Sequence, residues 1–114
     1  MTKEKIIETI IELASEDAYG SWELWGSVKQ DSADGDTPEL RKQFLDATEE
    51  LVRDDKLSVM HHKPPQDYPL VQLERSRLEH EIEHSGEPDP DNYYWFKTTK
   101  KGEEEDIAAR KEKF

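Results

Sequence analysis

The stretch TPELRKQFLDATEELVRDDKLSVMHH, from Thr37 to His62, decides how the fold of this chain is interpreted. Its first part predicts a helix, because Thr37 (or Asp36) can cap it and Pro38 occupies a first-turn position where a missing N–H costs nothing. Residues 57–62 then alternate as in a strand. The apolar positions of the helix recur at helical spacing. They are Leu40, Phe44, Ala47 and Leu51, with Leu45 and Val52 on the flank.

Two helices are predicted before this stretch. Residues 2–16 have a possible cap in Thr2 and a broad face of isoleucine, leucine and alanine. Tyr19-Gly20 is expected to break that helix, and Ser21 can cap a short second one. The second helix carries aromatic and apolar residues at successive i+3 steps, which we interpret as the packing centre. They are Trp22, Trp25 and Val28, with Leu24 beside them.

After the strand at 57–62, prolines end the β pairing, and residues 69–84 predict another helix with a thin apolar stripe. An acidic, turn-rich linker follows at 85–92. Tyr93–Thr98 is the strongest strand signal and is expected to pair antiparallel with 57–62. Two of its four aromatic residues must point away from the core. We expect them to pack under the 69–84 helix; otherwise they form an exposed aromatic surface for a protein partner. A last helix begins at Thr99.

Three blocks of sequence carry a resemblance to a known family. The order of elements is three helices, a strand, an insertion, a strand and a helix, and it resembles the winged helix-turn-helix domains of small bacterial regulators, the PadR-like group above all. Ala14 with YGSW resembles that family's junction between the first and second helices. The other two blocks resemble the entry into its wing, and its second wing strand with the threonine-x-x-glycine start of the next helix. They are LVRDDKL (51–57) and YYWFKTTKKG (93–102).

The resemblance implies an α+β winged-helix domain over residues 1–114, with a two-stranded antiparallel wing and a C-terminal helix. It also implies transcriptional regulation and a homodimer. The chain departs from the family between Pro64 and Asn92, where a short basic wing is usual and this sequence has a helical, acidic insertion.

Composition narrows the classes of function. Hydrophobic residues make up 32% of the chain and charged residues 39%, with a formal net charge of −12. Such a charge favours solubility and repels nucleic-acid phosphates and anionic membranes over long range. The chain contains no cysteine, so disulfides and thiolate metal sites are excluded. No signal-peptide or membrane-spanning run is visible, and the default expectation is the cytoplasm.

The negative charge is unevenly distributed along the chain. Residues 1–36 and 64–92 each carry −6, whereas 37–63 carry −1 and 93–114 carry +1. A local basic patch is therefore possible around the third helix and the wing. If DNA is bound, we expect Arg41, Lys42, Lys97, Lys100 and Lys101 to bind it, and His61, His62 and Lys63 are candidates for the same patch. Binding would be weak at physiological salt, because few phosphates are neutralised.

The outward face of the third helix argues for a different partner. Opposite its apolar stripe this helix carries three cations and four carboxylates. A DNA-recognition helix needs Arg, Lys, Asn or Gln on that face to contact base edges and phosphates. Lys42 with Asp46, and Glu49 with Arg53, are spaced for neutralising i,i+4 pairs. A salt-bridged, solvent-exposed face fits this helix better than a DNA-reading surface does. The residues themselves therefore favour a protein partner.

One segment, HEIEH at 80–84, matches the zinc-peptidase pattern H-E-x-x-H on a predicted helix. In that chemistry His80 and His84 bind zinc and Glu81 is the general base. Glu83 is atypical for such helices, no clear third ligand follows, and the histidines point away from the apolar stripe. Adventitious metal binding by the histidine pair is a better interpretation than catalysis.

The sequence thus predicts a non-enzymatic winged-helix regulatory or interaction module without a cofactor. Two alternatives remain open: an acidic protein-interaction domain that does not bind DNA, and, less favoured, a zinc metallopeptidase-like protein that uses the HEIEH segment.

Overall fold

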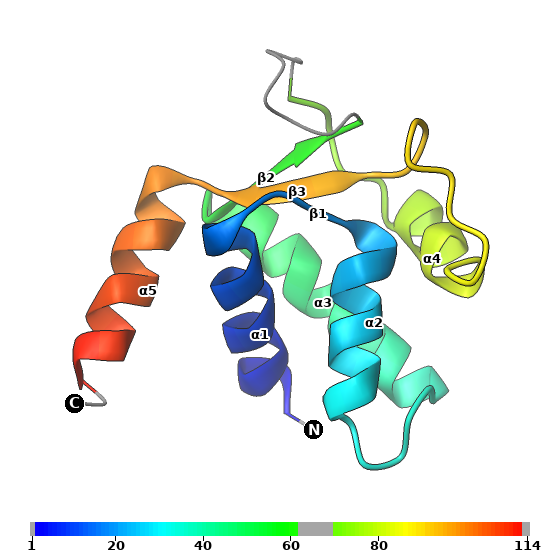
Figure 1. Cartoon of the computed structure of the whole chain (residues 1–114), viewed down its shortest axis with the longest axis horizontal. Coiled ribbons are helices and arrows are strands. Elements are labelled where there is room, and N and C mark those ends of the chain that lie inside the picture. Colours follow the sequence, from blue (N-terminus) through cyan, green and yellow to red (C-terminus); the bar gives the residue numbers. More distant parts are fainter. Residues whose placement is uncertain (1, 62–69, 113–114) are drawn as a thin grey trace.

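In the computed structural model, a small antiparallel sheet lies across one end of three helices (Figure 1). The structure describes residues 2–61 and 70–112, with side chains only as far as Asp106 in the last helix. Two further helices flank the sheet at its opposite ends. In chain order the elements are α1 (Lys3–Glu16), β1 (Tyr19–Gly20), α2 (Ser21–Asp31), α3 (Pro38–Arg53), β2 (Leu57–Met60), α4 (Arg75–Glu83), β3 (Trp95–Thr98) and α5 (Lys100–Glu112).

The predicted helix starts are confirmed at three places. The Thr2 hydroxyl accepts the N–H of Lys5 at 3.2 Å, and the Thr37 hydroxyl accepts that of Leu40 at 3.1 Å. At the start of α5, the Thr99 hydroxyl accepts the N–H of Gly102 at 3.1 Å. Each hydroxyl satisfies a first-turn donor that has no partner within its helix. These helix starts could be predicted from the sequence because each capping hydroxyl and the N–H that it accepts are only three residues apart.

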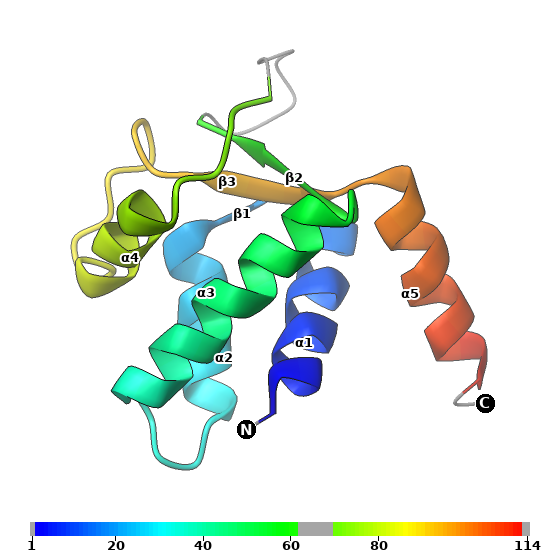
Figure 2. The same cartoon turned by 180° about the vertical axis from the view of Figure 1, so that it is seen from behind.

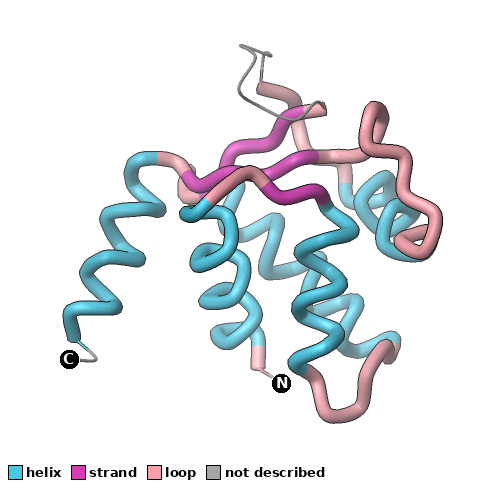
Figure 3. Tube along the Cα trace, viewed as in Figure 1, coloured by secondary structure: helices cyan, strands magenta, loops and turns pink. Residues whose placement is uncertain are grey.

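The sheet has one strand more than the sequence predicted. β2 and β3 pair antiparallel as expected, with Val59 opposite Phe96, but the order across the sheet is β1-β3-β2. Tyr19 and Gly20 lie opposite Phe96 and Trp95 (Figure 3). The expectation of a two-stranded sheet was wrong, because two extended residues have no periodicity that reveals a strand.

The main core lies between the helices and one face of the sheet. Trp25, Phe44, Tyr94 and Phe96 are its largest buried aromatics, and the Trp25 and Phe44 rings meet edge to face at 5.5 Å. Trp25 and Val28 therefore lie in the packing centre, as predicted. Trp22 does not.

Trp22 belongs to a second, smaller cluster with Ala18, Met60 and Trp95. Its ring stands edge-on to Trp95 at 5.1 Å and to Tyr93 at 5.9 Å. Neighbouring strand residues point to opposite faces, so Trp95 and Phe96 serve different clusters. We expected the outward aromatics to lie under the insertion helix. Instead the buried Tyr94 contacts the insertion, and Trp95 and Tyr93 pack against α2.

Three element boundaries differ from the predictions. The helix expected over 69–84 begins only at Arg75, the strand expected over 57–62 ends at Met60, and the strand expected from Tyr93 begins at Trp95. Residues 70–74 are not helical, since the Val71 N–H donates to the Val59 carbonyl at 3.0 Å and the Glu74 N–H to the Tyr94 hydroxyl at 3.1 Å. Both acceptors come from distant residues. His62, Lys63 and Pro69 lie outside the described residues.

Over the described ranges the fold is α+β, as predicted at that coarse level. None of the helices described here is both long and apolar enough to cross a bilayer.

Candidate functional site

The insertion helix α4 packs against α2 and α3, and its position decides what the third helix can contact (Figure 2). Leu78 and Ile82 are buried in the main core. The helix therefore closes the side of the α2–α3 pair instead of projecting into solvent as a wing would. Three sets of contacts hold it there.

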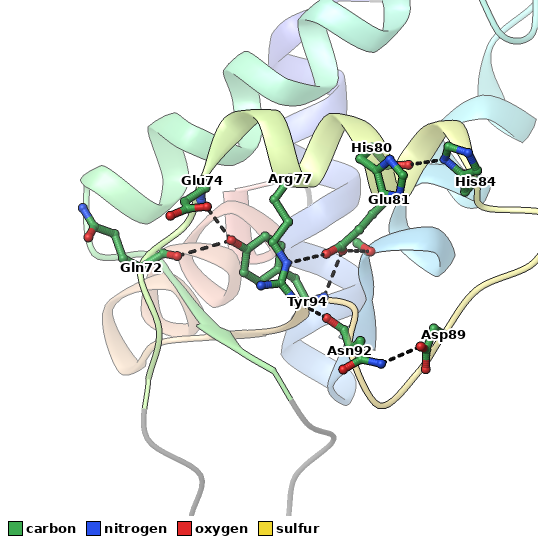
Figure 4. A network of polar contacts seen from close by, with 10 residues as sticks. Gln72, Glu74, Arg77, His80, Glu81, His84, Asp89, Asn92 and Tyr94 are labelled. Atoms are coloured by element: carbon green, nitrogen blue, oxygen red, sulfur yellow. Dashed lines mark hydrogen bonds and ion pairs between the residues drawn. The ribbon is translucent and has the colours of Figure 1, made fainter.

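The first contact is a buried carboxylate. Glu81 is 1% exposed, and its Oε1 accepts the Ser21 hydroxyl at 2.6 Å and the Tyr94 N–H at 2.9 Å. The Arg77 guanidinium lies 3.4 Å from Oε2 (Figure 4). Burial raises the pKa of Glu81, while the bonds from Ser21, Tyr94 and Arg77 act in the opposite direction. The Glu81 side chain therefore connects α4 to Ser21, the first residue of α2, and to Tyr94, the residue directly before β3.

The second contact surrounds the Tyr94 ring. Its hydroxyl donates to the Gln72 carbonyl at 3.4 Å and accepts from Glu74 at the start of α4. The Arg77 guanidinium lies over the ring at 5.0 Å, a cation–π geometry, and also donates to the Asn92 carbonyl. The segments on both sides of α4 are thereby tied to Tyr94.

The third contact joins α4 directly to α3. Nη1 of Arg75 lies 2.8 Å from Asp46 Oδ1 and also pairs with Glu49. The predicted i,i+4 pairs of Asp46 with Lys42 and of Glu49 with Arg53 were wrong. A helical wheel considers only cations on the same helix, and the stronger partner comes from the insertion.

Replacing Arg75 with alanine should destabilise the fold by about 1 kcal/mol. Partly exposed ion pairs are worth roughly 0.2–1 kcal/mol each, and Arg75 makes two. Arg53 is the matched control, since its partners are Glu50 and Asp54 on its own turn and its side chain is 71% exposed. Urea unfolding of R75A and R53A measures the difference. An equal, negligible loss in both would contradict the anchoring role of Arg75.

The cations predicted for DNA fall into two separate groups. Arg41 lies near the start of α3, whereas the Lys101 ammonium donates to the Asp54 carbonyl at the other end of that helix at 3.1 Å. Arg41 and Asp54 are about 20 Å apart along the helix axis. Lys97 and Lys100 are exposed near the Lys101 end, and Lys42 is exposed beside Arg41.

Arg41 is also neutralised. Its Nε and Nη2 donate to the two carboxylate oxygens of Asp36, both at 2.8 Å, and Nη1 lies 3.8 Å from Glu83 of α4. The guanidinium lowers the pKa of Asp36 through these bonds. A DNA phosphate would have to compete with a bidentate carboxylate for this side chain.

A groove of about 590 Å³ separates the start of α3 from α4. Its charged lining is mixed, so it offers no uniform surface to a phosphate backbone. The lining residues are Asp36, Pro38, Arg41, Lys42, Leu45, Arg75 and Glu79.

Within the HEIEH segment, His80, Glu83 and His84 face solvent, whereas Glu81 and Ile82 are buried. His80 and His84 are exposed, their ring centroids are 4.2 Å apart, and Nδ1 of His84 lies 2.9 Å from the His80 carbonyl. Glu81 points the other way, into its bonds with Ser21 and Tyr94 (Figure 4). Among the described residues, no three His, Asp or Glu side chains are grouped to hold a metal ion. The Glu81 carboxylate is therefore not placed to act as a base beside the histidine pair.

No protein-family model, curated protein or solved structure matches this chain. The functional argument therefore rests on the residues and their contacts.

Proposed function

We propose that this chain is a non-enzymatic interaction module, related in design to winged-helix regulators, that contacts a protein partner instead of reading DNA through its third helix. The family resemblance of Ala14 with residues 19–22, of residues 51–57 and of residues 93–102 supplies the winged-helix and regulatory part of this proposal. The contacts around α4 supply the choice of partner.

The observation that carries the proposal is the double ion pair of Arg75 with Asp46 and Glu49. It places α4 beside the outward face of α3, which is the face that a reading helix inserts into the major groove. That groove is about 12 Å wide and admits one helix. A second helix fixed alongside α3 obstructs such an insertion.

Charge supports the same conclusion. Arg41 and Arg75 are engaged by carboxylates, and Lys42 is the exposed cation beside them. A net charge of −12 opposes approach to a polyanion, and a few phosphate contacts give only weak binding at physiological salt. Protein surfaces with basic patches are attracted by the same field.

The test is a selection from random DNA duplexes, followed by fluorescence anisotropy at about 150 mM salt. We expect no enriched sequence and no binding that saturates. Enrichment of a sequence, together with weaker binding and a flatter salt dependence in the double variant R41E/K42E, would replace this proposal with a DNA-reading regulator.

A second experiment tests for the protein partner. A protein recovered with the tagged chain must bind it again as purified components with a fixed stoichiometry in calorimetry. A chain that neither selects DNA nor yields any such reconstituted complex would contradict the interaction role.

A further inference from the structure

The exposed face of α4 carries two of the four histidines of the chain, His80 and His84, about one helical turn apart. Their ring centroids are 4.2 Å apart, and the ring planes are inclined by 34°. Side chains at i and i+4 lie on the same face of a helix, and two histidines at this spacing can bind a single zinc ion. The helix therefore presents both imidazoles together to solvent (Figure 4).

A backbone contact fixes the position of the proton on one of these rings. Nδ1 of His84 lies 2.9 Å from the His80 carbonyl oxygen. A carbonyl oxygen only accepts hydrogen bonds, so Nδ1 carries the proton, and the lone pair of the neutral ring is on Nε2. Histidines that bind metal ions commonly donate their other ring N–H to a carbonyl in this way, which orients the ring. His84 is thus arranged as a metal ligand before an ion binds.

The neighbouring carboxylates do not add a third ligand to the pair. Glu81 is turned inward, to the Ser21 hydroxyl and the Tyr94 N–H. Glu83 is exposed, and its Oε1 lies 3.8 Å from Nη1 of Arg41. No third His, Asp or Glu of the described ranges is grouped with the two rings to hold an ion. An ion held by two imidazoles keeps coordination positions for water, so it exchanges with ions in solution.

We propose that His80 and His84 form a two-histidine site for a divalent transition-metal ion that prefers imidazole ligands: Cu²⁺, Ni²⁺ or Zn²⁺. Mg²⁺ and Ca²⁺ prefer oxygen ligands and are excluded from this class. Among the three ions Cu²⁺ should bind most tightly, because affinity for a given set of ligands follows the Irving–Williams order. The net charge of −12 attracts every cation, and the two imidazoles select among them. The site does not depend on the protein partner proposed above.

Such an ion would connect the last turn of α4 to the residue that caps it. His80 lies in that turn, and His84 is the C-cap residue. Exposed side chains change rotamer within picoseconds to nanoseconds, so the two rings can close on an ion while the backbone keeps its helical conformation. The unfolded chain does not hold the rings at this spacing. The ion therefore binds the folded state more tightly and stabilises it.

The probe for the test is Zn²⁺, titrated into the intact, tag-free chain in the presence of excess Mg²⁺, which occupies weak carboxylate sites. Calorimetry measures the affinity, and NMR shifts of backbone amides and imidazoles locate the ion. We expect one Zn²⁺ per chain, with shifts confined to the second half of α4 and the turn after it. Two linked ligands exceed a single one in affinity by about 10²-fold or more, so H80Q and H84Q should each weaken binding by about hundredfold.

The other two histidines of the chain, His61 and His62, supply the matched control. H61Q/H62Q removes as many imidazoles as H80Q/H84Q and leaves the formal net charge unchanged. It should alter Zn²⁺ affinity by less than about twofold. Far-UV circular dichroism verifies that both double variants are folded. Zn²⁺ should raise the Tm of the wild type and of H61Q/H62Q, but not that of H80Q/H84Q.

Several outcomes would overturn the assignment of this site. They are equal weakening by H61Q/H62Q and H80Q/H84Q, unchanged affinity in both H80Q and H84Q, or shifts centred away from α4. Binding that does not approach saturation at about 1 mM Zn²⁺ would also overturn it. Each of these results would mean that the chain holds an adventitious ion only.

Discussion

Replacing Glu81 with alanine is expected to lower the free energy of unfolding by about 3 kcal/mol. The Ser21 hydroxyl and the Tyr94 N–H would lose their acceptor in the interior. Each unsatisfied buried donor costs about 1–3 kcal/mol, and the vacated side-chain volume adds a cavity term. Urea unfolding measures the loss. A change below about 1 kcal/mol would show that water or rearrangement satisfies both donors.

Glutamine at position 81 is the matched variant, because its carbonyl oxygen keeps an acceptor for both donors without the charge. The pKa of Glu81 is raised in the folded state from its ordinary value of 4.5 by burial. Its contribution to stability is thus fully present below pH 4.5 and is lost as pH rises through the folded-state pKa. The difference in unfolding free energy between E81Q and wild type should therefore shift in favour of glutamine from pH 4.5 toward neutrality.

The difference between these two proteins isolates Glu81 from the other carboxylates, which titrate in both. A difference independent of pH would show that the bonds from Ser21, Tyr94 and Arg77 fully offset the effect of burial.

Alanine at Gly102 is expected to destabilise the fold by about 2 kcal/mol. A Cβ built there meets the Lys56 carbonyl oxygen at 2.3 Å, and that atom belongs to the backbone before β2. The same oxygen accepts the Thr99 N–H at 3.1 Å, so α5 cannot move away without losing a bond at its start. Overpacking of this kind costs about 1–3 kcal/mol and outweighs the better helix propensity of alanine.

Gly26, in the middle of α2, is the control for this substitution. A Cβ added there meets no atom within 4 Å. Alanine should therefore stabilise the protein by roughly 0.5–1 kcal/mol through helix propensity alone. Thermal unfolding of G26A and G102A should move in opposite directions. A G102A protein as stable as wild type would mean that α5 is not seated on Lys56.

The close approach at Gly102 links the sequence to the fold in an instructive way. The threonine-x-x-glycine block predicted a helix start, and Thr99 does bond the Gly102 N–H. The sequence did not indicate why glycine is needed at its end. The reason is the carbonyl of Lys56, which is distant in the chain.

Glu81 is a residue whose role the sequence partly revealed. On a helical wheel it lies about 60° from Leu78, at the edge of the apolar stripe. That position indicates burial, whereas the H-E-x-x-H pattern predicts a general base at Glu81. Its partners, Ser21 and Tyr94, come from two other parts of the chain, so no local pattern names them.

The sequence by itself determined α1, α2, α3 and α5, the caps at Thr2, Thr37 and Thr99, and the antiparallel pairing of β2 with β3. These features depend on side-chain periodicity and on hydrogen bonds between near neighbours, which are written in consecutive residues. Only the tertiary structure decided the third strand at Tyr19–Gly20, the separation of Trp22 from Trp25, and the packing of α4 against α3 through Arg75. Each of these depends on which distant segments meet, and on the partner that a polar or aromatic group finds when water is excluded.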